Sequence, residues 1–285
     1  MTGNADYIGA DVGWTIDELN EALAAAEIGA KAVPNSCTRS EILSNVINFN
    51  SNEYIDLKNG ECNFDTPEFA KLLEFIKSFP ESPNYSSGSD EQSAIMGGRL
   101  LVHQTIYNGF GSVLTEEIRL GGKVAYKGFP CESRNGSVAE TVETLAISSV
   151  SEHKDAAWSF IRQFLTPDYQ RGMFDGFPSN KILFNEQAAY WTTDTYDENG
   201  KLIPKGYIYK GYTSEIESTY GAMSLEQLNK FRVFLRSVDS MTSYDWTLGE
   251  IISQEAAAFF AGDKTAEETA ALIQNRVGLY VGERQ

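Results

Sequence analysis

The sequence predicts an α/β protein, in which helices and strands pack in layers. Runs of apolar residues at helical spacing are interspersed with short β-like runs, and the helical runs are in excess. Of the 285 residues, 42% are hydrophobic and 22% are charged, an ordinary globular composition for one large domain or two smaller ones. The sequence has no internal repeat and no low-complexity segment.

The first predicted helix begins behind Thr15. Thr15 and Glu18 have the T-x-x-E spacing of a capping box, and apolar residues recur at helical spacing after them. Trp14 precedes this helix at the position of a hydrophobic staple. A second helix is expected over about residues 38–48.

A hairpin and a third helix are expected in the stretch EYIDLKNGECNFDTPEF. Asn59 and Gly60 are typical of a hairpin turn. Thr66 followed by Pro67 is typical of a helix start. The helix over residues 68–79 is expected to bury Phe69, Leu72, Leu73 and Ile76 on one side.

Three apolar runs in the middle of the chain predict strands. They are LLVHQTIY (residues 100–107), KVAYKGF (123–129) and ETLAISS (143–149). A helix is expected to follow, and its helical spacing predicts a buried stripe made of Ala156, Phe160, Ile161 and Phe164.

The last part of the chain predicts a hairpin and three helices. The run Asp197-Glu198-Asn199-Gly200 is typical of a hairpin turn. Thr265 and Glu268 form another capping box. The three helices are expected over about residues 224–238, 244–261 and 265–282.

The charge of the chain argues against a nucleic-acid partner. The formal net charge is −17, from 23 Lys+Arg and 40 Asp+Glu. Nucleic-acid binding requires a basic surface that meets the phosphates. The charge suggests a neutral or cationic partner, and it is equally typical of an acidic, solubilising surface.

Most signatures of catalysis, metals and cofactors are absent from the sequence. There is no H-E-x-x-H, no G-x-S-x-G and no G-x-x-x-x-G-K-[ST] motif. Gly109-Phe110-Gly111 lacks the third glycine of a dinucleotide-binding fingerprint. Cys37, Cys62 and Cys131 form no C-x-x-C pair. We therefore expect no catalytic residue, no metal and no cofactor.

The sequence also shows no targeting segment. Its first 20 residues contain no basic n-region and no apolar h-region, so we expect no export signal in this chain. No apolar run reaches the roughly 18 residues of a transmembrane helix. The chain is therefore expected to be intracellular or the exported part of a longer protein.

Aromatic residues are numerous, and many lie in predicted loops. The chain has 16 Phe, 14 Tyr and 4 Trp. Sugar rings present apolar C–H faces surrounded by hydroxyl groups, so a stacked aromatic ring beside polar side chains is the site that such a ligand needs. Core packing is the other common role of aromatic residues.

Several stretches follow one another in a specific order. They are GWTIDELNEAL, YIDLKNGECNFDTPEFAKLLEFIKSFP, IMGGRLLV with IYNGF, AISSVSEHKDAAWSFIRQFLTPDYQ, and EAAAFFAGDKTAEETAALIQNRVGLYV. In this order they resemble the extracellular solute-binding proteins of family 1, the carbohydrate-receptor lipoproteins of ABC importers. The resemblance covers about residues 13–285.

The resemblance implies a periplasmic-binding-protein-like fold of type II with two lobes. Residues 1–127 would form the first part of lobe 2, and residues 128–179 the returning portion of lobe 1 with its hinge crossings. Residues 180–285 would form the C-terminal helical part of lobe 2. The family's export signal, its lipid-anchoring cysteine and the first part of lobe 1 have no counterpart here, so we expect an incomplete first lobe.

The same resemblance implies candidate ligand-binding residues. They occupy three places: after the strand that ends near residue 107, just past the first hinge crossing, and at the start of the penultimate helix. The candidates are Tyr107, Asn108, Phe110, Glu132, Asn135, Tyr244 and Trp246. Trp158, by contrast, is expected to pack structurally.

The function implied is non-catalytic capture of a sugar or oligosaccharide by hinge closure. The partner would be an ABC permease in the membrane, and the receptor would act as an extracellular, membrane-anchored monomer. One alternative is a glycosidase-like enzyme with a pair of carboxylates, although no pair is marked in the sequence. Another is a receptor for a peptide or polyamine on the same fold.

Overall fold

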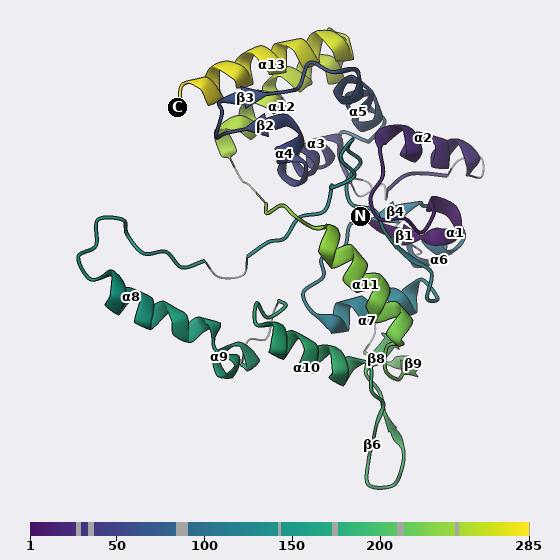
Figure 1. Cartoon of the computed structure of the whole chain (residues 1–285). Helices are drawn as coiled ribbons and strands as arrows, with labels where there is room; N and C mark the ends of the chain where they lie inside the picture. Colours follow the sequence, from purple (N-terminus) through teal and green to yellow (C-terminus); the bar gives the residue numbers. More distant parts are fainter. Residues whose placement is uncertain are drawn as a thin grey trace. The chain divides into compact units, whose positions relative to one another are not determined.

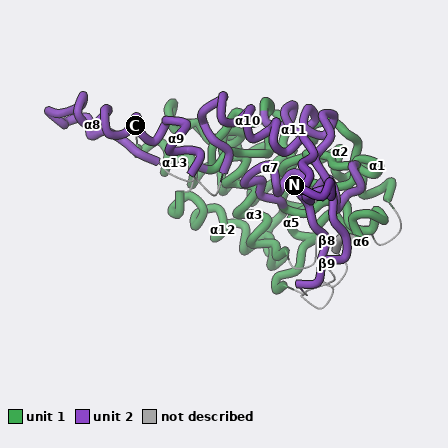
Figure 2. Tube along the Cα trace, turned by 90° about the horizontal axis from the view of Figure 1, so that it is seen from below, with its two compact units in different colours: residues 1–104, 123–140, 236–285 green, residues 105–122, 141–235 purple. Residues whose placement is uncertain are grey.

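The computed structural model describes residues 1–26, 30–33, 37–83, 91–141, 144–172, 176–209, 214–242 and 245–284. The chain divides into two compact units (Figure 2). Unit 1 comprises Met1–Gln104, Lys123–Glu140 and Arg236–Gln285, and unit 2 comprises Thr105–Gly122 and Thr141–Leu235. These boundaries are not those of the expected lobes, and the assignment of segments to lobes stays a prediction.

A small antiparallel sheet organises the first part of unit 1. Strand β1 (Thr2–Asn4) lies between β4 (Val102–His103) and β5 (Val124–Tyr126). Within the described residues, the predicted strand over residues 100–107 is thus limited to two residues. It pairs with β1 only at two positions, and a strand needs a partner along its length.

Helices α2 and α5 of unit 1 begin where the sequence predicts. Thr15 and Glu18 form the predicted capping box of α2 (Ile16–Ala25). Thr66 caps α5 (Pro67–Lys77). The other helices of unit 1 are α1 (Ala5–Ile8), α3 (Arg39–Phe49), α4 (Ser51–Tyr54), α6 (Glu91–Met96), α12 (Trp246–Ala261) and α13 (Ala266–Gly282).

The predicted hairpin between α4 and α5 is confirmed, and it packs beside α13 (Figure 1). It consists of β2 (Ile55–Asp56) and β3 (Glu61–Cys62). The side chain of Gln274 in α13 fixes the end of the hairpin. Its Nε2 donates to the carbonyl oxygen of Cys62 at 2.9 Å, and its Oε1 accepts from the N–H of Phe64 at 2.6 Å.

One continuous hydrophobic core fills unit 1. The predicted inner side of α5 lies in this core, where Phe69 is fully buried and its ring contacts those of Tyr54 and Phe64. Trp14 is also buried, and its indole N–H donates to the carbonyl oxygen of Gly128 at 3.1 Å. The core therefore links the start of the chain to segments more than a hundred residues away.

Unit 2 contains shorter elements. Its helices are α7 (Phe110–Arg119), α8 (Lys154–Ile161), the 3-10 helix η2 (Arg162–Leu165), α9 (Pro167–Arg171), α10 (Lys181–Trp191) and most of α11 (Leu225–Ser237). Its strands form two hairpins, β6 (Thr195–Tyr196) with β7 (Leu202–Ile203) and β8 (Gly206–Tyr209) with β9 (Ile216–Tyr220). The predicted turn at Asp197–Gly200 is thereby confirmed.

Two predictions for unit 2 are wrong. Residues 144–149 of the predicted ETLAISS strand contain no strand, because no described segment pairs with them. Helix α8 forms, but the expected stripe is not buried: no residue of α8 is buried, and Phe160 is 65% exposed. The stripe has helical spacing, yet the described part of unit 2 does not cover it. Trp158 is likewise half exposed.

Candidate binding site on unit 1

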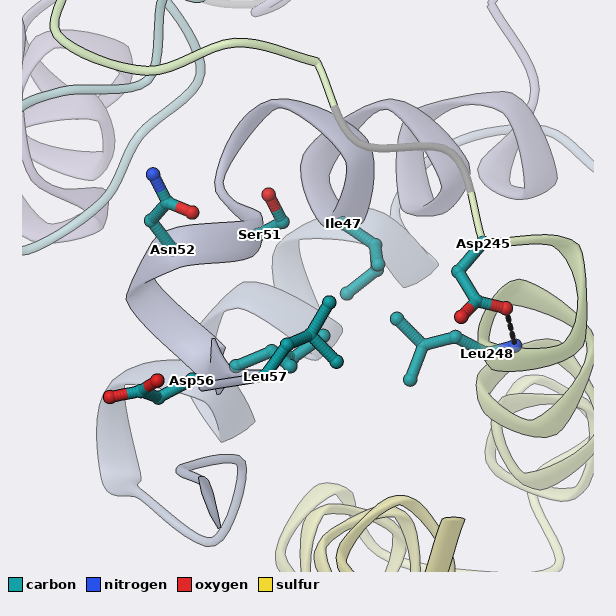
Figure 3. A pocket seen from close by; sticks show the side chains of 8 residues that line it. Ile47, Ser51, Asn52, Asp56, Leu57, Asp245 and Leu248 are labelled. Atoms are coloured by element: carbon teal, nitrogen blue, oxygen red, sulfur yellow. Dashed lines mark hydrogen bonds between the residues drawn. The ribbon is translucent and has the colours of Figure 1, made fainter. Parts of the chain in front are cut away.

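The short helix α4 borders three cavities of unit 1. The first has a volume of about 360 Å³ (Figure 3). Its lining residues are Ile47, Ser51, Asn52, Ile55, Asp56, Leu57, Asp245 and Leu248. The second, of about 240 Å³, shares Asn52 with the first. The third, of about 140 Å³, shares Glu53 and Cys131 with the second.

The first cavity combines an apolar wall with a polar margin. Figure 3 shows the side chains of Ile47, Leu57 and Leu248 converging, whereas Asp56 points away from them. The carboxylate of Asp56 accepts hydrogen bonds from the backbone N–H groups of Lys58 and Asn59, and so stabilises the turn that follows it.

Asp245 fixes the other side of the first cavity. Its carboxylate caps α12 by accepting from the N–H of Leu248 at 3.1 Å, and it also accepts from the hydroxyl of Tyr280 and from Arg284. Burial raises the pKa of Asp245, but these hydrogen bonds and the Arg284 charge outweigh it and hold the pKa below its usual value. Asp245 is therefore an ionised carboxylate that stabilises the N-terminus of α12.

The second cavity is polar. Its lining residues are Phe49, Asn50, Asn52, Glu53, Cys131, Ser133, Asn135, Asp239 and Ser240. Asn52 Nδ2 donates to Ser240 Oγ at 3.0 Å, and Ser240 Oγ donates to Asp239 Oδ1 at 2.8 Å. Asn50 is only 4% exposed, and its Nδ2 donates to the carbonyl oxygen of Pro130 at 3.0 Å. Its Oδ1 is buried without a hydrogen-bond partner among the described residues.

The third cavity is acidic. It is lined by Ile16, Glu53, Tyr54, Asn63, Thr66, Glu68, Leu72, Pro130, Cys131 and Glu132. Burial strongly raises the pKa of Tyr54, and the neighbouring Cys131 and glutamates add to the rise. Burial also raises the pKa of the Cys131 thiol, with a further contribution from Glu53. The phenol and the thiol are therefore neutral at physiological pH.

Two of the predicted ligand-binding residues of unit 1 line these cavities. Glu132 lines the third cavity, and Asn135 lines the second. Trp246 is the first residue of α12, directly after Asp245, and it is 89% exposed. Tyr244 lies outside the described residues.

The other predicted residues lie in unit 2. The rings of Tyr107 and Phe110 both contact Phe231, with centroid distances of 5.5 and 6.4 Å. Phe110 is 2% exposed and packs in the interior of unit 2. Asn108 is exposed, and its carbonyl oxygen accepts from the N–H of Gly176 at 2.9 Å. A ligand-binding role for these three residues stays a prediction.

Sequence patterns alone do not single out four polar residues of the second cavity, Asn50, Asn52, Glu53 and Asp239. The first three belong to the run NFNSNEY, which follows the predicted second helix and is dense in Asn and Ser. Such a polar run between apolar elements was a usable signal. Asp239 carries no comparable signal, because only the fold brings it to α4 through Ser240 and Asn52.

No family model matches the sequence, and neither does any curated protein. Solved structures do match. The sugar-binding protein MalE from the phytopathogen Xanthomonas citri is 15% identical, with a TM-score of 0.51, over 99% of this chain and 68% of that one. The cyclic alpha-maltosyl-1,6-maltose binding protein from Arthrobacter globiformis is 14% identical, with a TM-score of 0.50, over 99% of this chain and 69% of that one.

At these identities the likeness shows the fold alone. The described elements mix helices with short strands, as the sequence predicted. The chain therefore has the α/β fold of the periplasmic-binding-protein-like, two-lobe solute-binding proteins, and the resemblance to extracellular solute-binding proteins of family 1 is confirmed at the level of the fold.

Proposed function

We propose that this chain is the non-catalytic substrate-binding component of an ABC importer and that its ligand is a sugar or oligosaccharide. The observation that carries the proposal is the first cavity at the start of α12, on a fold shared with sugar-binding proteins. In this role the chain would act outside the cytoplasmic membrane, as a monomer, and deliver its ligand to a membrane permease.

The cavity has the chemistry that a pyranose ring requires. Ile47, Leu57 and Leu248 offer an apolar wall for the C–H face of a ring. Ser51 and Asn52 supply polar atoms at the margin for hydroxyl groups. An apolar wall with polar groups at its margin is the arrangement that orients an amphipathic ligand.

Trp246 is the aromatic residue that we assign to stacking. A tryptophan that is 89% exposed is unusual, because an indole normally finds apolar cover. Its position directly after Asp245, which lines the cavity, places it at the same helix start. Stacking against a sugar would supply the missing cover.

Capture would follow the hinge closure that the fold family uses. Closure around a ligand is a common route from binding to signalling in two-lobe proteins. Tyr107 and Asn108 remain our candidates for additional contacts in unit 2. They are half-buried and exposed, respectively, whereas Phe110 would act by supporting the ring of Tyr107 through Phe231.

The test is titration of intrinsic tryptophan fluorescence with a panel of mono- and oligosaccharides. We expect a saturable change, and we expect Trp246→Ala to weaken binding by about tenfold or more, which corresponds to about 1.4 kcal/mol. Trp158→Ala is the matched control, since Trp158 is also exposed but lies on α8. It should leave the affinity unchanged.

Two results would contradict the proposal. One is a folded protein, checked by circular dichroism, whose fluorescence and melting temperature respond to no sugar in the panel. The other is sugar binding that survives Trp246→Ala unchanged, which would remove Trp246 from the site.

A further inference from the structure

The second and third cavities contain acidic side chains and no basic ones. Their linings include four carboxylates, from Glu53, Glu68, Glu132 and Asp239, and neither lining contains Lys or Arg. Glu53 belongs to both linings, so the acidic groups form one continuous set around α4. A ligand in these cavities would meet an excess of negative charge.

Basic side chains close to this set are bound elsewhere. The pKa of Lys71 is raised mainly by Asp17, with which its Nζ forms an ion pair at 2.7 Å. Glu68 and Glu132 contribute less to this rise. Arg134 lies between the lining residues Ser133 and Asn135, and its guanidinium forms an ion pair with Glu18. Within the described residues, none of the four cavity carboxylates forms an ion pair.

A second, independent observation indicates a missing hydrogen-bond donor. Asn50 lines the second cavity and is 4% exposed, so its side chain is almost completely shielded from water. Its Nδ2 is satisfied by Pro130, while its Oδ1 accepts no hydrogen bond from any described residue. A buried acceptor without a donor is costly, and native proteins rarely keep one without a use.

The neighbouring groups show that the local potential is negative. Burial is the largest cause of the raised pKa of Tyr54. Cys131 and the carboxylates of Glu53, Glu132 and Glu68 raise it further. Burial is also the largest cause of the raised pKa of Cys131, and the carboxylate of Glu53 adds to it. The part of these shifts that comes from the carboxylates, as distinct from burial, disfavours an anion and favours a cation.

We propose that the second and third cavities receive the protonated amino group of an amino sugar. The inference rests on the proposed function and adds the ligand's chemical class. An ammonium group carries three donors and one positive charge. In the second cavity it would meet the carboxylates of Glu53 and Asp239 and the Oδ1 of Asn50, and Asn52 joins that cavity to the apolar wall of the first, on which the ring would lie.

A protonated amine fits the described groups better than a metal ion. The described residues include no group of three or more His, Cys, Asp or Glu side chains that could hold a metal. The acceptors instead lie around a cavity of about 240 Å³, which has room for a polyatomic group. Carboxylates facing a neutral ligand would lose water without gaining a counter-charge.

The experiment is isothermal titration calorimetry of the full chain with three β-1,4-linked oligosaccharides of equal length. They are the glucosamine, N-acetylglucosamine and glucose oligomers, which differ at carbon 2 by an amine, an acetamide or a hydroxyl group. At a pH where the amine is protonated, we expect the glucosamine oligomer to bind at least about tenfold more tightly than the other two.

Paired variants connect this preference to the cavities. Glu53→Gln with Asp239→Asn keeps the shape of both side chains and removes two charges, and we expect it to abolish the preference. Glu21→Gln with Glu74→Gln removes two exposed charges from α2 and α5, outside the linings, and should retain it. Circular dichroism and thermal melting would confirm that both double variants are folded.

Each other outcome is decisive. Equal affinity for the three oligomers would overturn the amine inference and leave the proposed function intact. A preference that both double variants lose equally would trace it to the −17 net charge and overturn the inference. Tighter binding of spermidine than of any sugar would replace the amino sugar with a polyamine. Absence of all sugar binding would overturn the proposed function, and this inference with it.

Discussion

Unit 1 and the α8–η2 segment of unit 2 both contain helices, but only the helices of unit 1 bury their apolar side chains. In unit 1, side chains such as Leu19, Val46 and Phe69 have no exposed surface. In α8 and η2 no residue is buried. Both regions carry apolar residues at helical spacing, so the difference does not lie in the local sequence.

The contacts of the aromatic residues show what differs. In unit 1, Tyr54, Phe64 and Phe69 come from α4, a loop and α5, and their rings meet at 5.1 to 5.2 Å. In the α8–α9 region, Phe160 contacts Phe164, which contacts Tyr169, and these partners are near neighbours along the chain. Helical spacing thus specifies which face is apolar, whereas burial requires a second element.

The largest expected effect is at the centre of the unit 1 core. Phe69→Ala should lower the free energy of unfolding by about 3–5 kcal/mol, because it removes a fully buried ring with two ring partners. Phe69→Leu, which keeps most of the volume, should cost about 1 kcal/mol. Urea denaturation followed by far-ultraviolet circular dichroism measures both, and a loss below 1 kcal/mol for Phe69→Ala would break the comparison.

The next effect tests whether unit 2 is loosely packed throughout. The Glu117 carboxylate in α7 is fully buried and pairs with Lys230 of α11 at 2.9 Å. Lys230→Met should destabilise unit 2 by about 2–4 kcal/mol, because it removes the Lys230 charge from beside a buried carboxylate. Hydrogen exchange of α7 and α11 would detect the loss locally.

A double variant serves as the control for that pair. Adding Glu117→Gln to Lys230→Met removes the buried charge, and we expect it to restore at least half of the lost protection. No restoration would mean that Lys230 acts through packing rather than charge. Unchanged protection in Lys230→Met would show that the Glu117–Lys230 pair does not stabilise α7 and α11.

A smaller effect concerns the start of α12 in unit 1. Asp245→Ala removes the helix cap and the acceptor for Tyr280 and Arg284, so we expect a loss of about 1–2 kcal/mol. The folded-state pKa of Asp245 lies below its unfolded value. Its stabilising contribution is therefore present at neutral pH and is lost as the pH falls through the folded-state pKa, below about pH 4.

The neutral variant Asp245→Asn isolates this pH dependence. Asparagine still caps a helix, so α12 should keep its start, while the acid-dependent part of the stability at this site should disappear. Unfolding by urea at several pH values compares the two. An unchanged slope below pH 4 in Asp245→Asn would show that other carboxylates dominate acid unfolding.

The smallest effect is expected on α8. Phe160→Ala should change the free energy of unfolding by less than about 0.5 kcal/mol, because the ring is 65% exposed and leaves no cavity. A loss similar to that of Phe69→Ala, measured in the same urea experiment, would show that α8 is covered in solution. The contrast in burial between α8 and unit 1 would then not hold in solution.

Local signals predicted most helices and turns. Capping boxes at Thr15 and Thr265 and the Asn59-Gly60 turn each satisfy backbone groups within a few residues, so the sequence contains all that they need. The strand over residues 143–149 failed for the opposite reason, because strand pairing depends on a partner from elsewhere in the chain.

The site was less predictable than the fold. Trp246 and Asn135 were proposed by resemblance to known stretches, and their ligand-binding role stays a prediction. Asn135 lines a cavity, and Trp246 follows Asp245, which lines another. Asp239 and the unsatisfied Oδ1 of Asn50 depend on chain segments that meet only after folding. Their roles could not be predicted from spacing.

The short helix α4 has a consequence for how ligand preference can change. Asn52 borders two cavities and Glu53 borders two, although the residues are adjacent. One substitution at Asn52 or Glu53 would thus alter two neighbouring cavities together. A change of ligand preference would then require only one or two substitutions in α4.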